Sequence, residues 1–475
     1  MNIKCFNTIL SIILYGTTSL APASETYTIS FPTHLDLKEN GSFDVSIIDS
    51  SISDKDDINI KFDDSFILTD THGKASIEGK LNNTSVNFNS NDLNTKTINY
   101  SISNASAGKW SGNIGVYISL EQKAETNLFI DGPSINSILK KLNPQTITFS
   151  HNQSGNYLYD LSLAKDESVL LYKNGDEVII ANNVDKPIKA NQDMSYVFSD
   201  LNVSTINNIN YIDMSNCQSM ERMFQRSKIV NLDLSSFDTS NVNNMSYCFE
   251  SMHSLKNLAG LENFDVSNVT TFAYLMNDDM ALLTVPNLSG WSVTDKCTNL
   301  SYMLASIAYT PGVKSSSLWP SDVDYSGWNV SNVTNMSGLF MGAFNITNLD
   351  LTSWDTSKVT NMSSMFRMED NNVRSALKQI KGIDDFDVRN VIDMSYMFYS
   401  CISLTTDNSF IKWNPKNVSS LIYTFYDTRR LELNDFNNWI NIIDIDNVDI
   451  TECFGAQSGN TTHRGYKPQW YLDYS

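Results

Sequence analysis

One eight-residue phrase, V-x-x-M-x-x-M-F, recurs along the chain and limits the folds that are open to it. Clear copies end at Phe249, Phe340, Phe366 and Phe398. With degenerate copies at either end there are ten, and they finish at positions 198, 224, 249, 276, 304, 340, 366, 398, 425 and 454. A period of about 26 residues that is kept over ten copies predicts a stack of structural repeats rather than one ordinary core.

The spacing within a copy suggests what each repeat contains. Apolar residues at i, i+3, i+6 and i+7 predict one face of a short helix. An alternating stretch lies between copies, as in IVNLDLSSF (229–237), and alternation is typical of a half-buried strand. Serines that could cap the helices stand two residues before several copies, at Ser240, Ser267, Ser331 and Ser357. We therefore expect an α/β repeat solenoid over 191–457, with one continuous parallel sheet, and a C-terminal cap over 458–475.

The amino-acid sequence of the repeat resembles that of a known family. FDTSNVNNMSYCF (237–249) and WDTSKVTNMSSMF (354–366) are similar to the repeat of BspA-like leucine-rich-repeat surface proteins, which is also abundant in mycoplasma lipoproteins. The resemblance covers 191–457. It implies a leucine-rich-repeat-like fold in a secreted or surface protein that attaches to host proteins or other cells. The chain has no cysteine at the predicted leader cleavage point, so a lipid anchor is not implied.

The N-terminal 23 residues have the layout of a secretory signal peptide. One lysine precedes an apolar stretch from Phe6 to Tyr15, and APA follows at 21–23. The alternative is a buried first strand. We expect cleavage after Ala23 and a secreted or extracellular protein, associated with the cell surface, if at all, without a covalent anchor motif.

The segment between the leader and the repeats differs in kind. Short alternating runs separated by Asn, Asp, Gly and Ser predict an antiparallel β-sandwich over 24–122. AGKWSGNIGVYISL (107–120) is similar to a β-domain that precedes such repeats in Gram-positive secreted proteins. Residues 123–190 are interpreted as a connector and an N-terminal cap for the repeats.

The composition excludes several classes of partner. The chain has 33 basic and 53 acidic residues, a net charge of −20, which disfavours binding to nucleic acid and to anionic membranes. After the leader, no apolar run reaches the ~18 residues of a membrane-spanning helix. We expect no membrane span.

No pattern of catalytic or metal-binding residues stands out. The histidines are far apart and lie near no cysteine pair, and none of the common hydrolase or nucleotide-binding motifs occurs. We therefore expect no enzymatic activity, no metal and no cofactor. The five histidines are His34, His72, His151, His253 and His463.

A column of large aromatic residues precedes the repeat phrase by five or six positions. Its members are Phe237, Phe264, Trp291, Trp328, Trp354, Phe386 and Trp413. A ring beside an alternating strand is expected to fill the core, although a platform for stacking sugars is the alternative.

A second column holds tyrosine at position i+5 of the phrase. On the predicted helix this position points away from the buried face, so the rings would form either a row packed on itself or an exposed contact surface. The candidate partner-binding residues are Tyr196, Tyr247, Tyr274, Tyr302, Tyr396 and Tyr423.

These features together predict a monomeric, non-enzymatic binding protein. Its partner would be a protein or a glycan, and its function adhesion or host-protein interaction through the repeats. The alternative is a carbohydrate- or cell-wall-binding module with an exposed aromatic row.

Overall fold

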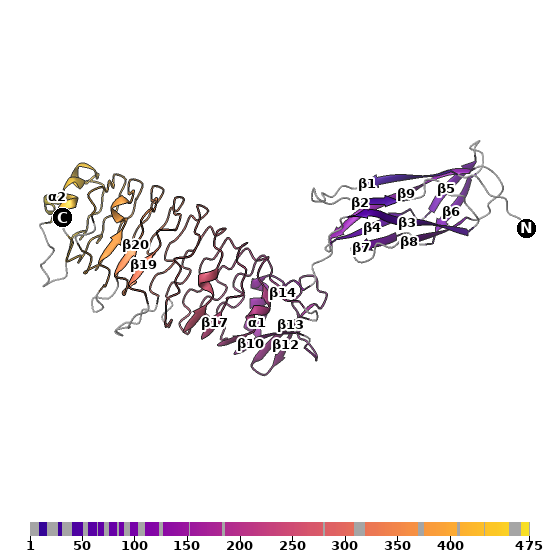
Figure 1. Ribbon diagram of the computed structural model, residues 1–475, viewed down its shortest axis with the longest axis horizontal. Helices are drawn as coiled ribbons and strands as arrows, with labels where there is room; N and C mark the ends of the chain where they lie inside the picture. The colour runs from indigo at the N-terminus through magenta and orange to yellow at the C-terminus, as the bar shows by residue number, and fades with distance from the viewer. Residues whose placement is uncertain are drawn as a thin grey trace, which may run out of the picture. The chain divides into compact units, whose positions relative to one another are not determined.

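The structure is a computed structural model, and it forms two compact units, Met1–Thr126 and Asn127–Ser475, each taken here by itself (Figure 1). The residues that it describes are 9–16, 27–30, 40–50, 56–63, 65–70, 76–82, 85–89, 96–102, 110–122, 127–151, 153–182, 186–278, 281–307, 319–368, 375–405, 409–431, 433–455 and 467–474.

The described part of the first unit consists of strands. They pair in the order β2-β3-β8-β6-β5-β9-β4-β7, with β1 beside β9. The antiparallel pairing that the sequence predicts is present, but hydrogen bonds connect all nine strands into one sheet rather than the two sheets of a sandwich. The strands are β1 (Ile9–Gly16), β2 (Tyr27–Ser30), β3 (Asn40–Ser50), β4 (Asp56–Phe62), β5 (Ser65–Asp70), β6 (Ser76–Leu81), β7 (Ser85–Asn89), β8 (Lys96–Ile102) and β9 (Trp110–Gln122).

The described part of the apolar stretch of the predicted signal peptide, from Ile9 on, lies in β1. This strand runs parallel to β9, from Ile9 opposite Ser111 to Gly16 opposite Ile118, whereas β4 runs antiparallel to β9. Residues 9–16 therefore have a place in the sheet. The signal peptide itself stays a prediction.

The second unit begins with a compact α/β segment. Helix α1 (Gly132–Leu142) starts after Asp131, whose carboxylate accepts a hydrogen bond from the backbone N–H of Ser134 at 2.8 Å. Its Ile135 and Leu139 are buried. A five-stranded sheet accompanies it, in the order β11 (Tyr159–Asp160), β12 (Val169–Asn174), β13 (Glu177–Asn182), β10 (Thr146–His151) and β15 (Thr205–Asn207).

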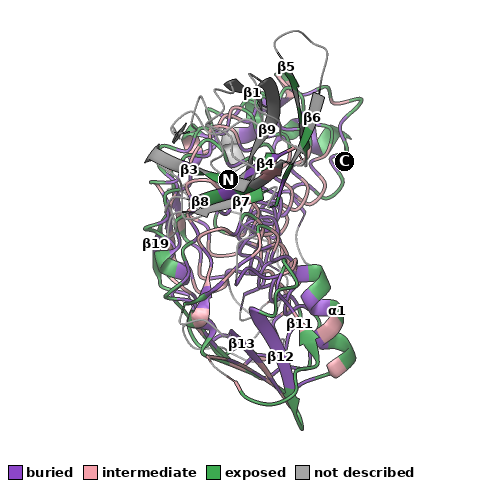
Figure 2. Ribbon diagram, turned by 90° about the vertical axis from the view of Figure 1, so that its right-hand side faces the viewer, coloured by how far each residue is buried: buried purple, intermediate pink, exposed green. Residues whose placement is uncertain are grey.

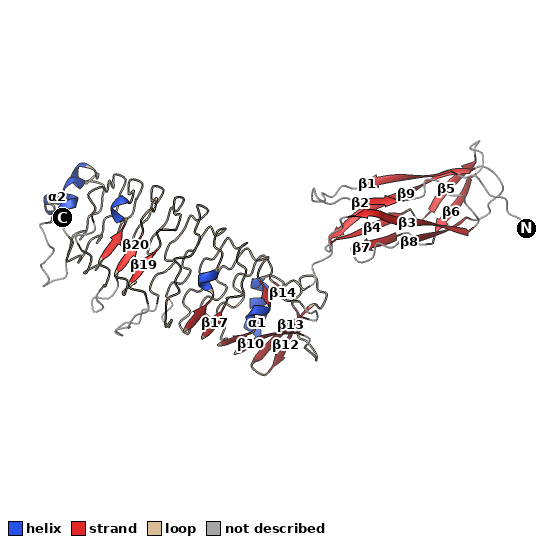
Figure 3. Ribbon diagram, in the orientation of Figure 1, coloured by secondary structure: helices blue, strands red, loops and turns tan. Residues whose placement is uncertain are grey.

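The predicted helix of each repeat is not formed. In the copy at 242–249 the backbone N–H of Tyr247 donates to Ala273 O at 2.8 Å, and that of Phe249 donates to Leu275 O at 2.9 Å. Backbone hydrogen bonds therefore join a repeat to the next one instead of closing a helical turn. An α-helix needs φ near −63° at each residue. The residue at position i+5 has a positive φ in every copy, so a helix cannot continue through it. The segments are turns, drawn as loop in Figure 3.

The predicted continuous parallel sheet is also absent. Strands in the repeats are two or three residues long and form small separate parallel sheets. At another position of the repeat, single parallel bridges join consecutive copies from Asp193 through Asn244 to Asp449. The fold class inferred from the sequence, an α/β repeat solenoid, is therefore wrong. These strands are β14 (Ile188–Lys189), β16 (Ile212–Asp213), β17 (Asn231–Asp233), β18 (Asn257–Ala259), β19 (Asp322–Asp324), β20 (Asn348–Asp350) and β21 (Gln379–Lys381).

The few helical turns of the second unit flank the repeats or fill corners. Four are 3₁₀ turns and the last is an α-helix. They are η1 (Ile209–Tyr211), η2 (Leu261–Asn263), η3 (Ile383–Asp385), η4 (Leu433–Asn441) and α2 (Gln469–Tyr474).

The serines expected to cap helices serve the corners instead. The backbone N–H of Ser240 donates to Asp238 Oδ1 at 3.0 Å, and that of Ser357 donates to Asp355 Oδ1 at 3.0 Å. A side chain that accepts a hydrogen bond two residues on is an Asx turn, which bends the chain locally. With no helix to cap, these D-x-S sequences form corners of the repeat.

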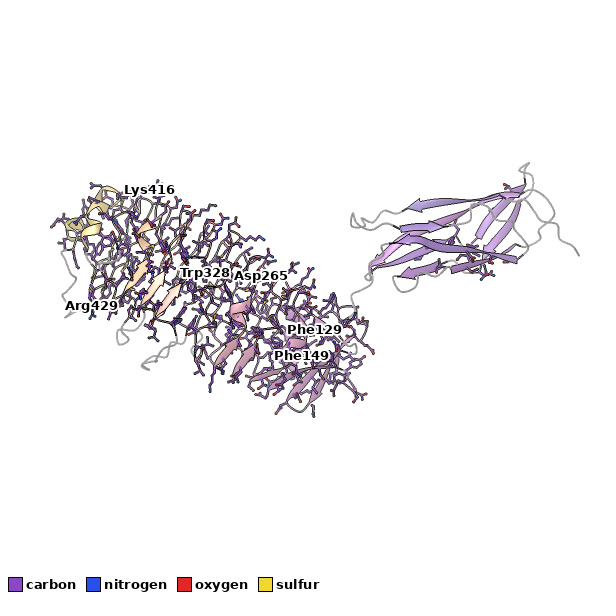
Figure 4. All side chains as sticks on the ribbon, in the orientation of Figure 1. Phe129, Phe149, Asp265, Trp328, Lys416 and Arg429 are labelled. Carbon is purple, nitrogen blue, oxygen red and sulfur yellow. The ribbon has the colours of Figure 1, made fainter. Side chains whose placement is uncertain are left out.

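The core of the second unit is filled by the apolar positions of the phrase and by the first aromatic column. Met245 and Phe249 are fully buried, and every ring of that column is buried; the buried residues of the interior are coloured purple in Figure 2. Trp328, labelled in Figure 4, is 1% exposed, and Trp354 Nε1 donates to Tyr325 O at 2.8 Å. The interpretation of this column as core is confirmed.

Cysteines of the repeats are part of the same core. All five between Cys217 and Cys453 are buried. Burial raises the pKa of the Cys217 thiol to about 12 and that of Cys297 to about 12 as well. These thiols are neutral packing groups rather than nucleophiles.

Candidate functional site

The six candidate tyrosines occupy one corner of successive repeats. In the copy at 242–249 the N–H of Cys248 donates to Met245 O at 3.3 Å, which closes a four-residue turn with Tyr247 at its third position. The φ of Tyr247 is 57°, in the left-handed region where glycine is preferred. The same position has φ between 50° and 63° in all ten copies, so the turn is a constant of the repeat.

The turn sets the direction of each ring, and the hydrogen bonds between repeats set the spacing. The rings of Tyr247 and Tyr274 stack with centroids 4.7 Å apart and 4° between their planes. Tyr274 and Tyr302 follow at 4.8 Å and 11°. This distance equals the separation of hydrogen-bonded strands, as expected when adjacent repeats pair through their backbones. We call the six tyrosines the tyrosine column.

The column is half-buried. None of its rings reaches the burial of Met245 or Phe249, and none is fully exposed. Burial raises the pKa of Tyr274, and the neighbouring phenols of Tyr302 and Tyr247 raise it further. The hydroxyl group of Tyr274 therefore remains a neutral hydrogen-bonding group around neutral pH.

Two arginines extend the column, and neither was identified from the sequence. Arg222 takes the tyrosine position in its own copy, and its Cζ lies 4.4 Å from the ring centroid of Tyr247 and 5.5 Å from that of Tyr196. Its Nε lies 3.3 Å from Glu221 Oε1 but makes no hydrogen bond. Arg222 would have been found by reading position i+5 in every copy.

The second arginine joins a short parallel row. Arg367 Cζ lies 4.9 Å from the ring centroid of Tyr396 and 5.5 Å from that of Tyr399. Tyr399 in turn stacks on Tyr426 at 5.1 Å. Tyr399 and Tyr426 both hold position i+8, just past the end of the repeated phrase.

Two small residues divide the column into blocks. Gly338 and Ser364 hold the tyrosine position in consecutive copies. A side chain on Gly338 would collide with the ring of Tyr302, which lies over it. The structure thus brings Tyr196, Tyr247, Tyr274 and Tyr302 into one block with Arg222, and it stacks Tyr396 on Tyr423 at 5.2 Å in the other.

Asx turns hold the corner rigid. Asn244 Oδ1 accepts from the backbone N–H of Ser246 at 3.0 Å, while Asn244 Nδ2 donates to Glu221 Oε2 of the preceding repeat at 3.1 Å. Each ring is therefore positioned by a fixed backbone and by its neighbours. Such a surface suits contact rather than chemistry.

Metal binding and membrane insertion receive no support from the described residues. Within the ranges given above, no three His, Cys, Asp or Glu side chains are grouped so that they could hold a metal ion. None of the helices there has both the length and the apolar character to cross a membrane.

Comparison with known proteins identifies the repeats. No curated protein and no solved structure matches the chain. One family matches three times, over residues 192–316, 313–439 and 372–461, and together these matches span more than half of the 475 residues. The overlapping matches fit a unit that is repeated along the chain. The chain belongs to DUF285, the family described as Mycoplasma protein of unknown function.

Proposed function

We propose that the chain is an exported, non-enzymatic binding protein of the BspA-like kind, acting in adhesion or host-protein interaction, and that it contacts a protein partner through the tyrosine column. The observation that carries this proposal is the stack at Tyr247, Tyr274 and Tyr302, whose rings are half-buried and held in place. Side chains that are already ordered lose little entropy on binding. Tyrosine is also among the residues that dominate protein interfaces.

The geometry favours a protein over a glycan at this surface. Sugars stack on ring faces, and here the faces cover one another at 4.7 to 4.8 Å. What remains for a partner is the ring edges, the hydroxyl groups and the guanidinium of Arg222, which suit the mixed polar and apolar surface of a protein. The first aromatic column, which the carbohydrate alternative needed to be exposed, is buried.

The test replaces Tyr247, Tyr274 and Tyr302 together by Ser in the full chain. Serine is compatible with the turn, because Ser364 holds the same position with φ 58°. Purified extracellular-matrix proteins immobilised on a biosensor serve as partners. We expect binding to at least one of them, and at least a tenfold loss of affinity in the variant, because the contact edges are removed.

Two further variants of the chain serve as controls. The triple Tyr→Phe variant keeps the stack and loses only the hydroxyl groups, so it should bind better than the Ser variant. Replacing Tyr396 and Tyr423 by Ser reports on the other block. Equal affinity of the wild type and both Ser variants, with all proteins folded by circular dichroism, would disprove the role of the column.

A further inference from the structure

A cavity whose lining includes none of the tyrosine column lies beside the short strands of the first repeats. Its volume is about 540 Å³, within the range of small-ligand sites. It opens beside β17, β18 and η1. The cavity is lined by Ile206, Asn208, Ile209, Asn210, Asn231, Leu232, Asp233, Ser235, Ser236, Asn257 and Ala259.

The cavity offers hydrogen-bond donors and acceptors side by side. Asn257 Nδ2 donates to Asn231 Oδ1 at 2.6 Å, which leaves the Nδ2 of Asn231 and the Oδ1 of Asn257 for a ligand. Asp233 Oδ1 accepts from Ser235 Oγ at 2.6 Å, and its other oxygen is available. Among the described residues, the side chains of Asn210 and Ser236 have no hydrogen-bond partner.

The hydrogen bond from Ser235 lowers the pKa of Asp233, so the carboxylate stays ionised around neutral pH. The apolar part of the wall is compact. Leu232 and Ile209 are buried, and Ile206 is half-buried beside them. The cavity thus combines an apolar wall, which makes up more than half of the exposed lining, with exposed amides, hydroxyls and one carboxylate.

The charged residues in the cavity lining limit which class of ligand can bind. The lining holds one carboxylate and no Lys, Arg or His, so an anion would be repelled. It also has too few acidic groups for a cation site, and no metal-binding group of three occurs among the described residues. A neutral ligand with many hydroxyl groups remains. We propose that this cavity binds a neutral saccharide of one or two rings.

A saccharide fits this lining better than a peptide. A hydroxyl both donates and accepts, so adjacent hydroxyls can bind the free Asn257 Oδ1 and Asn231 Nδ2 together. The C–H face of a sugar ring can cover part of the apolar wall formed by Ile206, Ile209, Leu232 and Ala259. An extended peptide would present its own apolar side chains to the same wall, so a peptide is included in the test as the competing ligand.

The test uses saturation-transfer difference NMR on the full chain with N,N′-diacetylchitobiose, with cellobiose and with the uncharged peptide N-acetyl-alanyl-alaninamide. We expect at least one sugar to bind in the millimolar range and the peptide not to bind. Asn257→Leu removes the outer amide of the pair and should weaken sugar binding at least tenfold.

The chain provides a matched control. Asn348 on β20 donates to Asp322 Oδ1 at 2.5 Å, as Asn257 on β18 donates to Asn231, but Asn348 does not line the cavity. Asn348→Leu should leave sugar binding unchanged. The proposal is overturned if neither sugar binds, if only the peptide binds, or if both Leu variants lose binding equally. The tyrosine column can fail its own test without affecting this result.

Discussion

At the residue scale, the tyrosine position shows a local conflict. A residue other than glycine in the left-handed region costs about 1–2 kcal/mol, yet only one of ten copies uses glycine there, Gly338. In Tyr247, Tyr274 and Tyr302 the ring recovers energy by stacking on its neighbours. Aromatic pairs contribute about 0.5–1.5 kcal/mol beyond the burial of area. Stacking therefore offsets the backbone cost.

Tyr274 tests this balance because it stacks on both sides. Tyr274→Phe keeps both stacks and should change the free energy of unfolding by less than about 0.5 kcal/mol. Tyr274→Ala keeps the backbone cost and loses the ring, so we expect a loss of about 1–3 kcal/mol. Urea denaturation of the second unit, followed by far-UV circular dichroism, measures both. Equal stability of the two variants would show that the ring contributes nothing.

The sequence predicted which tyrosines share a column, because that follows from the period alone. It could not predict their conformation. A positive φ is expected of glycine or asparagine, so the tyrosine at position 247 does not indicate the positive φ that it adopts. The position of Arg222 at i+5 could be read from the sequence, whereas its insertion between two rings depends on the same turn and could not.

At the scale of elements, the error of the helix prediction has a physical cause. Spacing at i, i+3, i+6 and i+7 fits one face of a helix, but a chain of turns places the same residues inward. An isolated eight-residue helix is marginal, whereas hydrogen bonds between repeats satisfy the backbone groups without it. The alternating stretches were identified correctly as strands at β17 and β20, although each of these strands is only three residues long.

Two glycines fix corners where repeats approach closely. Gly260 has φ 88°, and a Cβ there would collide with the backbone of Leu234 and Ser235 in the preceding repeat. Gly382 has φ 82° and approaches Leu351 and Thr352 in the same way. A side chain at either position must push two repeats apart.

We expect Gly260→Ala to destabilise the second unit by at least about 1–3 kcal/mol, because it combines a left-handed backbone with a collision. Gly290→Ala is the matched control, since a Cβ there meets nothing within 4 Å. It should be neutral or stabilising by up to about 1 kcal/mol. Thermal unfolding by calorimetry compares them. If both substitutions have the same effect, close approach of the backbone is not what glycine provides at position 260.

At the scale of the whole molecule, each end of the repeat stack is covered. Helix α1 lies at the N-terminal end, and Trp470 and Tyr471 of α2 pack on Phe454 of the last copy at 6.0 and 5.2 Å. Trp470 Nε1 also donates to Phe436 O at 2.9 Å. Repeat proteins need such caps because an open end exposes core.

Replacing Trp470 and Tyr471 together by Ala should expose the rings at the last copy and lead the chain to self-associate. Light scattering coupled to size exclusion should show a monomer for the wild type and a mass that rises with concentration for the variant. A control with Tyr474→Ala, in the same helix but 56% exposed, should remain a monomer. A monomeric double variant would mean that α2 is not a cap.

The hydrogen bonds from one repeat to the next also determine how the molecule would respond to force. These bonds run from one repeat to the next, for example from Tyr247 N to Ala273 O and from Tyr274 N to Ser301 O. Tension applied along the stack therefore loads the junctions in series, and the weakest opens first. Each repeat that detaches releases about 26 residues, or roughly 85–95 Å of extended chain at ~3.3–3.6 Å per residue. A pulled chain would thus lengthen in steps, one repeat at a time, while the remaining repeats stay folded.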